Sequence, residues 1–416
     1  MSGFLKIVRN RLSWLRSVCP MLLAAAFIFL PHTAGAVCES AAGEAVQITD
    51  GVRITLPGGK SSAALLDAYR ASAVELAAES RIELCSDAAF SALYLIWDRT
   101  PMPWTLSTAD GTESAAGENG FLHEVVRLPK AAKAVTLQLG AEDASLCDIY
   151  VFSEGTLPDW VQQWEPPLDG AADLLVMPTH ADDEHLFFGG VLPTYAGERK
   201  LRVQVVYMTN HWKEAFRPHE LLDGLWVVGV TAYPVIGPFP NSKSAVPGLD
   251  AAIRVYGYDE VLAFQVEMLR RFKPFVVVGH DLNGEYGHGA HMLNAHTLAD
   301  ALPLSGRMDV FESSFAQYGA WEVSKCYLHL YKENGVVMNW DIPLDAFGGA
   351  TAYQMAELGF SKHVTQHKDF AMQRGGPHDC RKFGLVYTSV GPDLERNDLF
   401  ENIDIPSARA GQQPIV

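Results

Sequence analysis

Positive charge is scarce in this sequence, and the shortage excludes some partners. The 416 residues carry 32 lysines and arginines against 49 aspartates and glutamates, for a formal net charge of −17. A protein that binds nucleic acid through its phosphates needs a basic surface, so the composition argues against nucleic acid as a partner. The same excess of negative charge gives no support to docking on anionic lipid.

Several catalytic and anchoring features are also missing. No Gly-x-Ser-x-Gly motif occurs, which disfavours serine hydrolysis, and no glycine-rich loop opens a helix as a phosphate cradle. Beyond the first 36 residues, no apolar run is long enough to anchor the chain in a bilayer. With 48% hydrophobic residues and this length, the chain is expected to form about two folded domains.

The first 36 residues have the order of a secretory signal peptide. Four lysines and arginines precede the apolar segment Met21–Leu30, and the small residues Ala34–Ala36 follow it. The apolar segment is too short for a membrane-spanning helix, so it predicts export and cleavage, with an uncleaved anchor as the alternative. We therefore expect a secreted protein without a stable membrane anchor after cleavage.

Cysteine is sparse as well, with six residues in the whole chain. Export would allow those outside the signal segment to oxidise. Cys326 and Cys380 lie in the C-terminal half and are one pair that the sequence suggests, although it does not fix the connectivity. Cys38, Cys85 and Cys147 lie in the N-terminal half, so one of them would stay unpaired.

Two kinds of hydrophobic pattern divide the chain near residue 168. Residues 37–167 contain short strand-like segments with Gly, Pro, Asp and Ser between them, which predicts a β-sandwich domain. In residues 168–416, short apolar runs alternate with helix-like stretches, which predicts βαβ units and a mostly parallel sheet flanked by helices. The predicted strands are Leu174–Met177, Leu201–Met208, Ala232–Ile236 and Phe275–Val278, and the predicted helices are His185–Ala196, Pro218–Val228 and Asp259–Phe272.

Polar side chains gather in two loops that directly follow predicted strands. The first loop, Thr179–Glu184, holds an imidazole and two adjacent aspartates, and the second, His280–His291, ends in a His-x-x-His pair. Parallel sheets bind ligands at the carboxyl ends of their strands, so these side chains are expected to converge on one crevice. Acidic residues at a helix start can instead act as caps, but capping does not explain the imidazoles. Together the two loops predict a metal site.

Both loops resemble signatures of the PIG-L, or LmbE-like, zinc-dependent N-acetylglucosaminyl deacetylases. His180–Glu184 is similar to their His-Pro-Asp-Asp-Glu signature, and Asn283–His291 is similar to the second one. Arg217 with Glu220, and His363–Gln366, resemble two weaker elements. The resemblance covers residues from about 172 to about 370 and leaves the N-terminal region outside it. It implies a Rossmann-like fold, a secreted type with an extra N-terminal domain, and zinc as cofactor, with another divalent ion as the alternative.

The resemblance also implies a role for single residues around the metal. His180, Asp183 and His291 would be the zinc ligands. Asp182 would be the general base that takes a proton as water attacks an amide. The reaction would remove the acetyl group from an N-acetylated sugar or glycoconjugate.

Three further residues are expected around the substrate. The resemblance implies that His288 is a protonated imidazole facing the oxyanion, that Tyr286 polarises the amide carbonyl, and that Arg217 contacts substrate. The sequence departs from the family pattern at Ala181, which replaces proline, and at Ala290, where many members have an aspartate. The second departure puts the charge on His288 in question, unless Asp281 or Glu285 takes the place of that aspartate.

Three other functions compete with this reading. The first alternative is an iron(II) oxygenase, because its facial triad of two histidines and one carboxylate is also matched by His180, Asp182 and His291. That triad usually lies in a jelly roll. A metal-containing carbohydrate-binding protein without activity is the second alternative, since catalytic sites need tuned partners for their ligands. The third is an amidase that acts on a larger acyl group.

Overall fold

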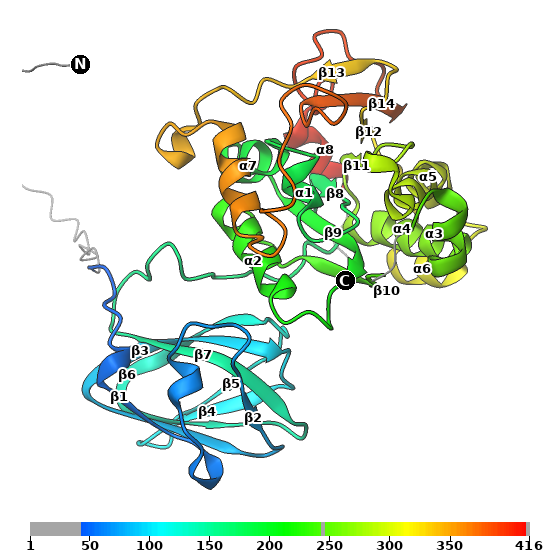
Figure 1. Cartoon of the computed structure of the whole chain (residues 1–416). Helices are drawn as coiled ribbons and strands as arrows, with labels where there is room; N and C mark the ends of the chain where they lie inside the picture. The colour runs from blue at the N-terminus through cyan, green and yellow to red at the C-terminus, as the bar shows by residue number, and fades with distance from the viewer. Residues whose placement is uncertain (1–42, 243–245, 413–416) are drawn as a thin grey trace, which may run out of the picture. The chain divides into compact units, whose positions relative to one another are not determined.

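The computed structural model describes residues 43–242 and 246–412 (Figure 1). The predicted signal peptide and Cys38 lie outside these ranges, so the expectation of export stays a prediction. Among the residues within them, no helix is long and apolar enough to cross a membrane.

The N-terminal region forms an antiparallel sheet in the strand order β2-β7-β3-β6-β4-β5, with β1 paired to β3. Its strands are β1 (Val52–Thr55), β2 (Val74–Leu76), β3 (Arg81–Arg99), β4 (Trp104–Thr108), β5 (Glu113–Ala116), β6 (His123–Gln138) and β7 (Ala144–Phe152). Register shifts near Phe90 allow the long strand β3 to pair with β1 at its start and with β7 at its end. The hydrogen bonds join all seven strands into one sheet, so the two-sheet sandwich and the domain boundary near residue 168 stay predictions.

The C-terminal region is built on a second sheet, in the order β10-β9-β8-β11-β12-β14-β13. Its strands are β8 (Leu174–Val176), β9 (Val203–Asn210), β10 (Val235–Pro240), β11 (Val276–Gly279), β12 (Lys325–His329), β13 (Gly335–Val337) and β14 (Lys382–Thr388). The first five strands along this order are parallel, and β14 and β13 complete the sheet in antiparallel fashion. The predicted mixed α/β fold with a mostly parallel sheet is therefore confirmed.

Helices cover both faces of this sheet (Figure 1). They are α1 (Asp183–Leu186), α2 (Arg217–Val227), α3 (Leu249–Tyr256), α4 (Tyr258–Phe272), α5 (Gly289–Ser305), α6 (Glu312–Tyr318), α7 (Ala352–Ser361) and α8 (Ile405–Gly411). Alternate residues of β8 explain the two layers. Leu174 and Val176 belong to the apolar cluster that includes residues of α2 and α7. Leu175 points to the opposite face, into the cluster that includes residues of α4 and α5.

Two of the predicted segments differ from the structure. The stretch predicted as one helix, His185–Ala196, is divided between α1 and a separate π-helix at Pro193–Glu198. The break falls at Gly189, which has a positive φ of 52°, and at Gly190, where a Cβ would lie 2.7 Å from the Trp340 ring. The strand predicted at Ala232 begins at Val235 instead.

The order of the strands creates a crevice beside β8. The chain passes from β8 to β9 on one side and reaches β11 on the other side only later. At such a switch point the loops that follow the two neighbouring strands diverge and leave room for a ligand. The loops after β8 and β11 are the two polar loops of the sequence.

The predicted Cys326–Cys380 disulfide is wrong. Both residues are free thiols, as are Cys85 and Cys147. Cys326 lies in β12 among the apolar residues of one sheet face, and Cys380 belongs to the apolar cluster of the other. Burial raises the pKa of Cys380 to about 12 and that of Cys326 further, so both act as small apolar residues of the core.

A buried ion pair fixes the C-terminal segment to β12. The Lys325 ammonium contacts the Asp393 carboxylate, and the Tyr327 hydroxyl donates to the other oxygen of Asp393 at 2.6 Å. We expect Asp393→Ala to lower the free energy of unfolding by about 3–5 kcal/mol, because it leaves a buried ammonium without its counter-charge. Urea denaturation would measure the change.

The exposed pair between Arg307 and Asp309 offers the control, because its side chains are 51% and 70% exposed. Asp309→Ala should change the midpoint of denaturation little. Equal losses in the two variants would contradict the structural role given to the buried pair.

Candidate metal centre

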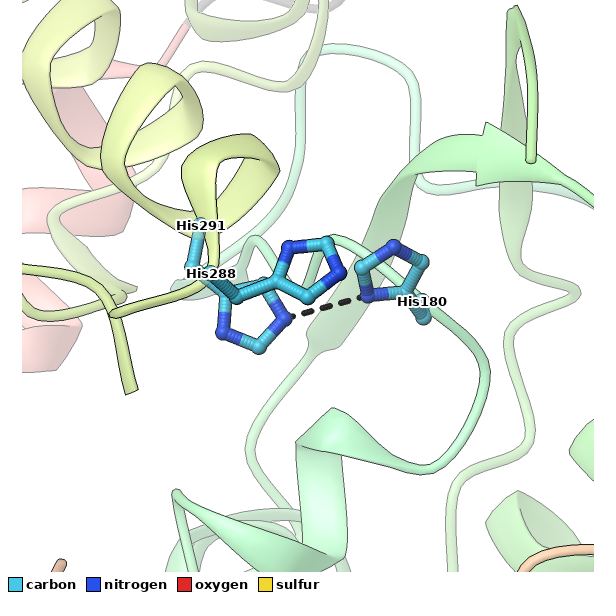
Figure 2. A group of neighbouring side chains, drawn as sticks. All are labelled: His180, His288 and His291. Atoms are coloured by element: carbon cyan, nitrogen blue, oxygen red, sulfur yellow. Dashed lines mark hydrogen bonds between the residues drawn. The ribbon is translucent and has the colours of Figure 1, made fainter. Parts of the chain in front are cut away.

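The three predicted metal ligands meet at one point. Nδ1 of His180 lies 3.2 Å from Oδ2 of Asp183 and 3.1 Å from Nε2 of His291, and the last two atoms are 3.3 Å apart. A tetrahedral zinc ion at its usual bond lengths holds its ligand atoms about 3.3 Å from one another. The triangle therefore has the dimensions of one face of a zinc site. Figure 2 shows the rings of His180 and His291 in contact, with His288 beside them.

The fold brings these ligands from two loops. His180 and Asp183 follow β8, and His291 lies in the first turn of α5, which follows β11. The His180 backbone N–H donates to Oδ2 of Asp183 at 2.7 Å, which folds the first loop around the carboxylate. Burial alone would raise the pKa of Asp183, but the neighbouring imidazoles, first His291 and then His280, hold it well below its usual range. The site thus keeps a buried negative charge that attracts a cation.

A fully buried carboxylate, Glu285, orients the ring of His291. Its Oε2 lies 2.9 Å from Nδ1 of His291 and 2.8 Å from Nδ1 of His280, and its Oε1 lies 2.6 Å from Nδ1 of His329. Because a carboxylate accepts, these Nδ1 atoms carry protons, and Nε2, which lies toward Asp183, is the nitrogen of His291 placed to bind a metal. The sequence left open whether this residue or Asp281 serves as the acidic partner in the loop. The structure shows that Glu285 serves His291 rather than His288.

His280 lies close to the ligands but is not set up to join them. It is within ligand distance of Asp183 and His291, so it forms a second group that could hold an ion. However, its Nε2 accepts a hydrogen bond from the Thr179 backbone at 2.9 Å, and its Nδ1 is bonded to Glu285. With both nitrogens engaged and the ring fully buried, His280 supports the loop after β8.

Asp182 stands next to the ligands in a strained conformation. Its φ of 117° is unusual for a residue with a side chain. The Glu184 carboxylate accepts the Asp182 backbone N–H at 2.8 Å and holds the turn. Burial raises the pKa of Asp182 to about 7, against the opposing effect of Arg217, whose Nη2 lies 3.5 Å from the carboxylate. The carboxylate in the ligand triangle is Asp183, so the geometry does not favour the iron triad that would use Asp182.

The two weaker motifs contact each other beside the site. Arg217, at the start of α2, donates to the Ala181 carbonyl, so it supports the metal loop in addition to lining the cavity. Glu220, one turn later, accepts the backbone N–H of Thr365 at 2.8 Å and its hydroxyl at 2.6 Å. This contact fixes the segment that places Gln366 in the cavity wall.

His288 and Tyr286 also line the cavity, which has a volume of about 250 Å³. Nδ1 of His288 accepts the Ala290 backbone N–H at 3.3 Å and caps α5. Burial, with the neighbouring His291, lowers the pKa of His288 to about 4, which favours a neutral ring instead of the predicted charged one. Tyr286 is half exposed, and its ring lies 4.2 Å from that of His378.

Several residues of the site were missed from the sequence. His211, at the end of β9, lines the cavity and accepts the Ala181 backbone N–H at 3.4 Å, but no motif surrounds it. His329 is the last residue of β12, and no motif around it marks it as a partner of Glu285. His363, which the sequence placed only in a weak motif, is fully buried, with Nε2 3.2 Å from Oε1 of Glu184.

The hydrogen bonds of Glu285 lead to a prediction about metal affinity. Glu285→Gln would keep the shape of the side chain but remove the charge that holds the Nδ1 protons of His291 and His280. We expect metal affinity to fall by about 10- to 100-fold, as measured by competition with a chromophoric chelator. Glu312→Gln, at the exposed start of α6, is the matched control. Wild-type affinity in Glu285→Gln, with a normal melting temperature, would refute the orienting role.

Comparisons with known proteins agree with the motifs. No protein-family profile matches the chain. A 1D-myo-inositol 2-acetamido-2-deoxy-alpha-D-glucopyranoside deacetylase from Mycobacterium leprae is 28% identical over 38% of this chain. The match spans about three fifths of that relative's length (59%). The enzyme of the same name from Mycolicibacterium gilvum is 25% identical over 56% of this chain and 87% of its own length.

A solved structure with a related name shows a weaker likeness. The N,N'-diacetylchitobiose deacetylase from Pyrococcus horikoshii is 16% identical over 47% of this chain and 71% of its own. Its TM-score is 0.36. The sequence relatives and the motifs together show that the chain is related, at low identity, to the PIG-L or LmbE-like deacetylases.

Proposed function

We propose that the protein is a metal-dependent hydrolase that removes the N-acetyl group from an N-acetylglucosamine-type sugar or glycoconjugate. The observation that carries the proposal is the triangle of His180, Asp183 and His291 with a second carboxylate, Asp182, in the same cavity wall. The relatives, which are named as deacetylases of a 2-acetamido sugar, support the same chemistry.

The donor set fits a borderline-soft divalent ion. Two imidazole nitrogens and one carboxylate oxygen are the three protein ligands that catalytic zinc sites use, although another divalent ion would also accept them. When bound, such an ion would act as a Lewis acid on the amide oxygen and would acidify the attacking water. His180, Asp183 and His291 would hold it, with Glu285 behind His291.

Asp182 is suited to move the proton. It lines the cavity beside the ligands without sharing their triangle, and burial keeps its pKa near neutrality. In our proposal its carboxylate takes a proton from water as the oxygen attacks the amide carbon. It then returns that proton to the amide nitrogen as the carbon–nitrogen bond breaks, which releases acetate and an amine.

His288 and Tyr286 can stabilise the negative oxygen that forms in between. Because Nδ1 of His288 accepts from the backbone, the neutral ring carries its proton on Nε2 and can donate it. The Tyr286 hydroxyl, on a side chain exposed to the cavity, is the second donor. Donors fixed before the reaction are effective because they need no reorganisation when charge develops.

We further propose that the protein acts outside the cytoplasm. The support is the signal-like order of the first 36 residues, which lie outside the described part of the chain. An acidic exported enzyme would weakly repel polyanions, which favours a neutral N-acetylated sugar as the substrate.

One observation favours a second candidate, a metal-containing sugar-binding protein without turnover. Ala290 removes the aspartate that many family members have beside the last ligand. In this structure the nearby carboxylate of Glu285 is bonded to His280, His291 and His329 instead of His288. A site in which His288 has no carboxylate partner could bind an acetamido sugar and leave the amide intact.

The function is tested by acetate release. We expect the metal-loaded protein to release acetate, with a free amine in equal amount, from N-acetylglucosamine conjugates, and a chelator to abolish the release. Equal amine without acetate would indicate an amidase with a different acyl group. Sugar binding by calorimetry without release of either product would favour the second candidate.

Asp182→Asn tests the base. The substitution keeps the size of the side chain, and asparagine tolerates a positive φ, but the amide cannot accept the proton. We expect turnover to fall by about 10²- to 10⁴-fold while the metal content of the purified protein stays at the wild-type level. Asp183→Asn is the comparison, because it should lose metal as well as turnover. Unchanged turnover in Asp182→Asn would rule out this assignment.

A further inference from the structure

A second hollow continues from the candidate metal centre along the edge of the sheet. It has a volume of about 320 Å³ and is lined by the loop after β9 and by β10. His211 and Asn241 line both this hollow and the cavity at the metal centre. Ligand pockets usually begin at about 300 Å³, so the cavity at the centre suits one small group, and the second hollow offers room for more of the substrate.

Trp212 is a large exposed side chain in this hollow. Its side chain is 61% exposed, although tryptophan is among the most buried residues on average. Two prolines of β10, Pro238 and Pro240, line the same hollow and add further apolar surface. A large exposed aromatic ring in a concave site beside the candidate centre offers a surface on which a ligand with an apolar face can pack.

Hydrogen-bonding groups surround these rings. Glu214 accepts from Nδ2 of Asn241 at 3.2 Å and pairs with Nδ1 of His211 at 2.9 Å, so it fixes the wall that the two hollows share. Asn210 lies in the same wall. The charged side chains that line the hollow are Lys213 and Glu214, one of each sign. Among the described residues, the lining therefore combines flat apolar rings and amide groups with one charge of each sign.

This combination suits a sugar ring, which has apolar C–H faces and a polar edge. It does not suit a polyanion, which would need several cations. We propose that the hollow around Trp212 binds the next sugar residues of an oligosaccharide whose N-acetylated residue lies at the metal centre. The proposal rests on the proposed deacetylase function and names its substrate class, a neutral chain of N-acetylated sugars rather than a single sugar.

A third hollow marks where a longer chain would continue. It has a volume of about 190 Å³, shares Trp212, and is mainly apolar, with Leu221 and Ile236 in its lining. Thr100 and Leu122 of the N-terminal region line its other side. Trp212 thus lies between the hollow next to the metal centre and one to which the N-terminal region contributes, which gives that region a part in holding long substrates.

The test compares substrates of different length. Acetate release by the metal-loaded full chain would be measured on N-acetylglucosamine and on its β-1,4-linked dimer, trimer and tetramer. We expect kcat/KM of the wild type to rise with chain length. In Trp212→Ala, we expect kcat/KM on the tetramer to fall by about tenfold, the effect of truncating an aromatic anchor, with the value for the monosaccharide unchanged. Trp212→Phe should retain most of the gain.

The control is Met308→Ala, because Met308 is another large exposed side chain (69%) and lies beyond the end of α5, outside the lining of all three hollows. It should leave every substrate unaffected. Equal losses on the monosaccharide and the tetramer in Trp212→Ala, or no dependence on chain length in the wild type, would overturn the proposal.

Failure of the deacetylase function itself would be recognised separately. If no substrate releases acetate, calorimetric binding of the tetramer to the wild type and to Trp212→Ala decides the question. A loss of affinity of about tenfold in the variant would support the sugar-binding hollow without the reaction, and equal affinity would overturn it.

Discussion

The candidate centre depends on one buried carboxylate that accepts hydrogen bonds from three imidazole groups. Glu285 is fully buried, and a buried charge is costly unless each of its oxygens is bonded. Here the Nδ1 atoms of His280 and His291 lie beside one oxygen, and His329 and the Asp281 backbone N–H lie beside the other. Burial alone would raise the pKa of Glu285, but His280 and the other imidazoles hold it well below its usual range. The charge therefore persists, and with it the orientation of the rings.

Each of these rings, once fixed by Glu285, positions a different part of the site. His291 directs Nε2 into the ligand triangle. His280 accepts the Thr179 N–H and so supports the loop that carries His180 and Asp183. His329 connects the carboxylate to β12, since its second nitrogen lies 3.2 Å from the Asp379 carbonyl. Because these contacts reach the loop after β8, the start of α5 and the strand β12, a shift of Glu285 would disturb all three together.

The N-terminal region contacts the same site through α2. His123 of β6 lies 2.9 Å from His219 of α2 between their ring nitrogens, and the Tyr94 hydroxyl is bonded to the other nitrogen of His123. In α2, His219 lies between Arg217, which donates to the Ala181 carbonyl in the loop after β8, and Glu220, which fixes the Thr365 segment. The region outside the family resemblance thus packs against α2, the helix whose Arg217 lies beside Asp182.

The sequence was sufficient to predict that the three candidate ligands lie together, because the motifs are local and follow apolar strands. His180 and Asp183 lie in one short loop, and their partner His291 belongs to an equally compact second motif, so the parallel-sheet pattern was enough to bring them together. The partners of these residues were harder to predict. His211 directly follows β9 and His329 is the last residue of β12, and nothing in the spacing relates either residue to the loops.

The errors have a similar origin in tertiary contacts. The helix predicted at His185–Ala196 has a suitable apolar pattern, but Gly189 turns the chain where Trp340 packs closely against it. The Cys326–Cys380 pair was inferred from position in the chain alone, and the structure places the two thiols in different apolar clusters. Gly189 and Trp340 are more than a hundred positions apart, and a local pattern does not contain such a contact.

The two consecutive aspartates show how the backbone divides one chemistry between neighbours. In a regular helix or strand, Asp182 and Asp183 would differ in direction but share much of their surroundings. The positive φ of Asp182 turns the chain between them, and Glu184 holds that turn through the Asp182 N–H. Asp183 therefore lies among imidazoles that keep its pKa low, whereas burial raises the pKa of Asp182 to about 7. One carboxylate is thereby suited to bind a cation and the other to carry a proton, a division that the residue types alone do not determine.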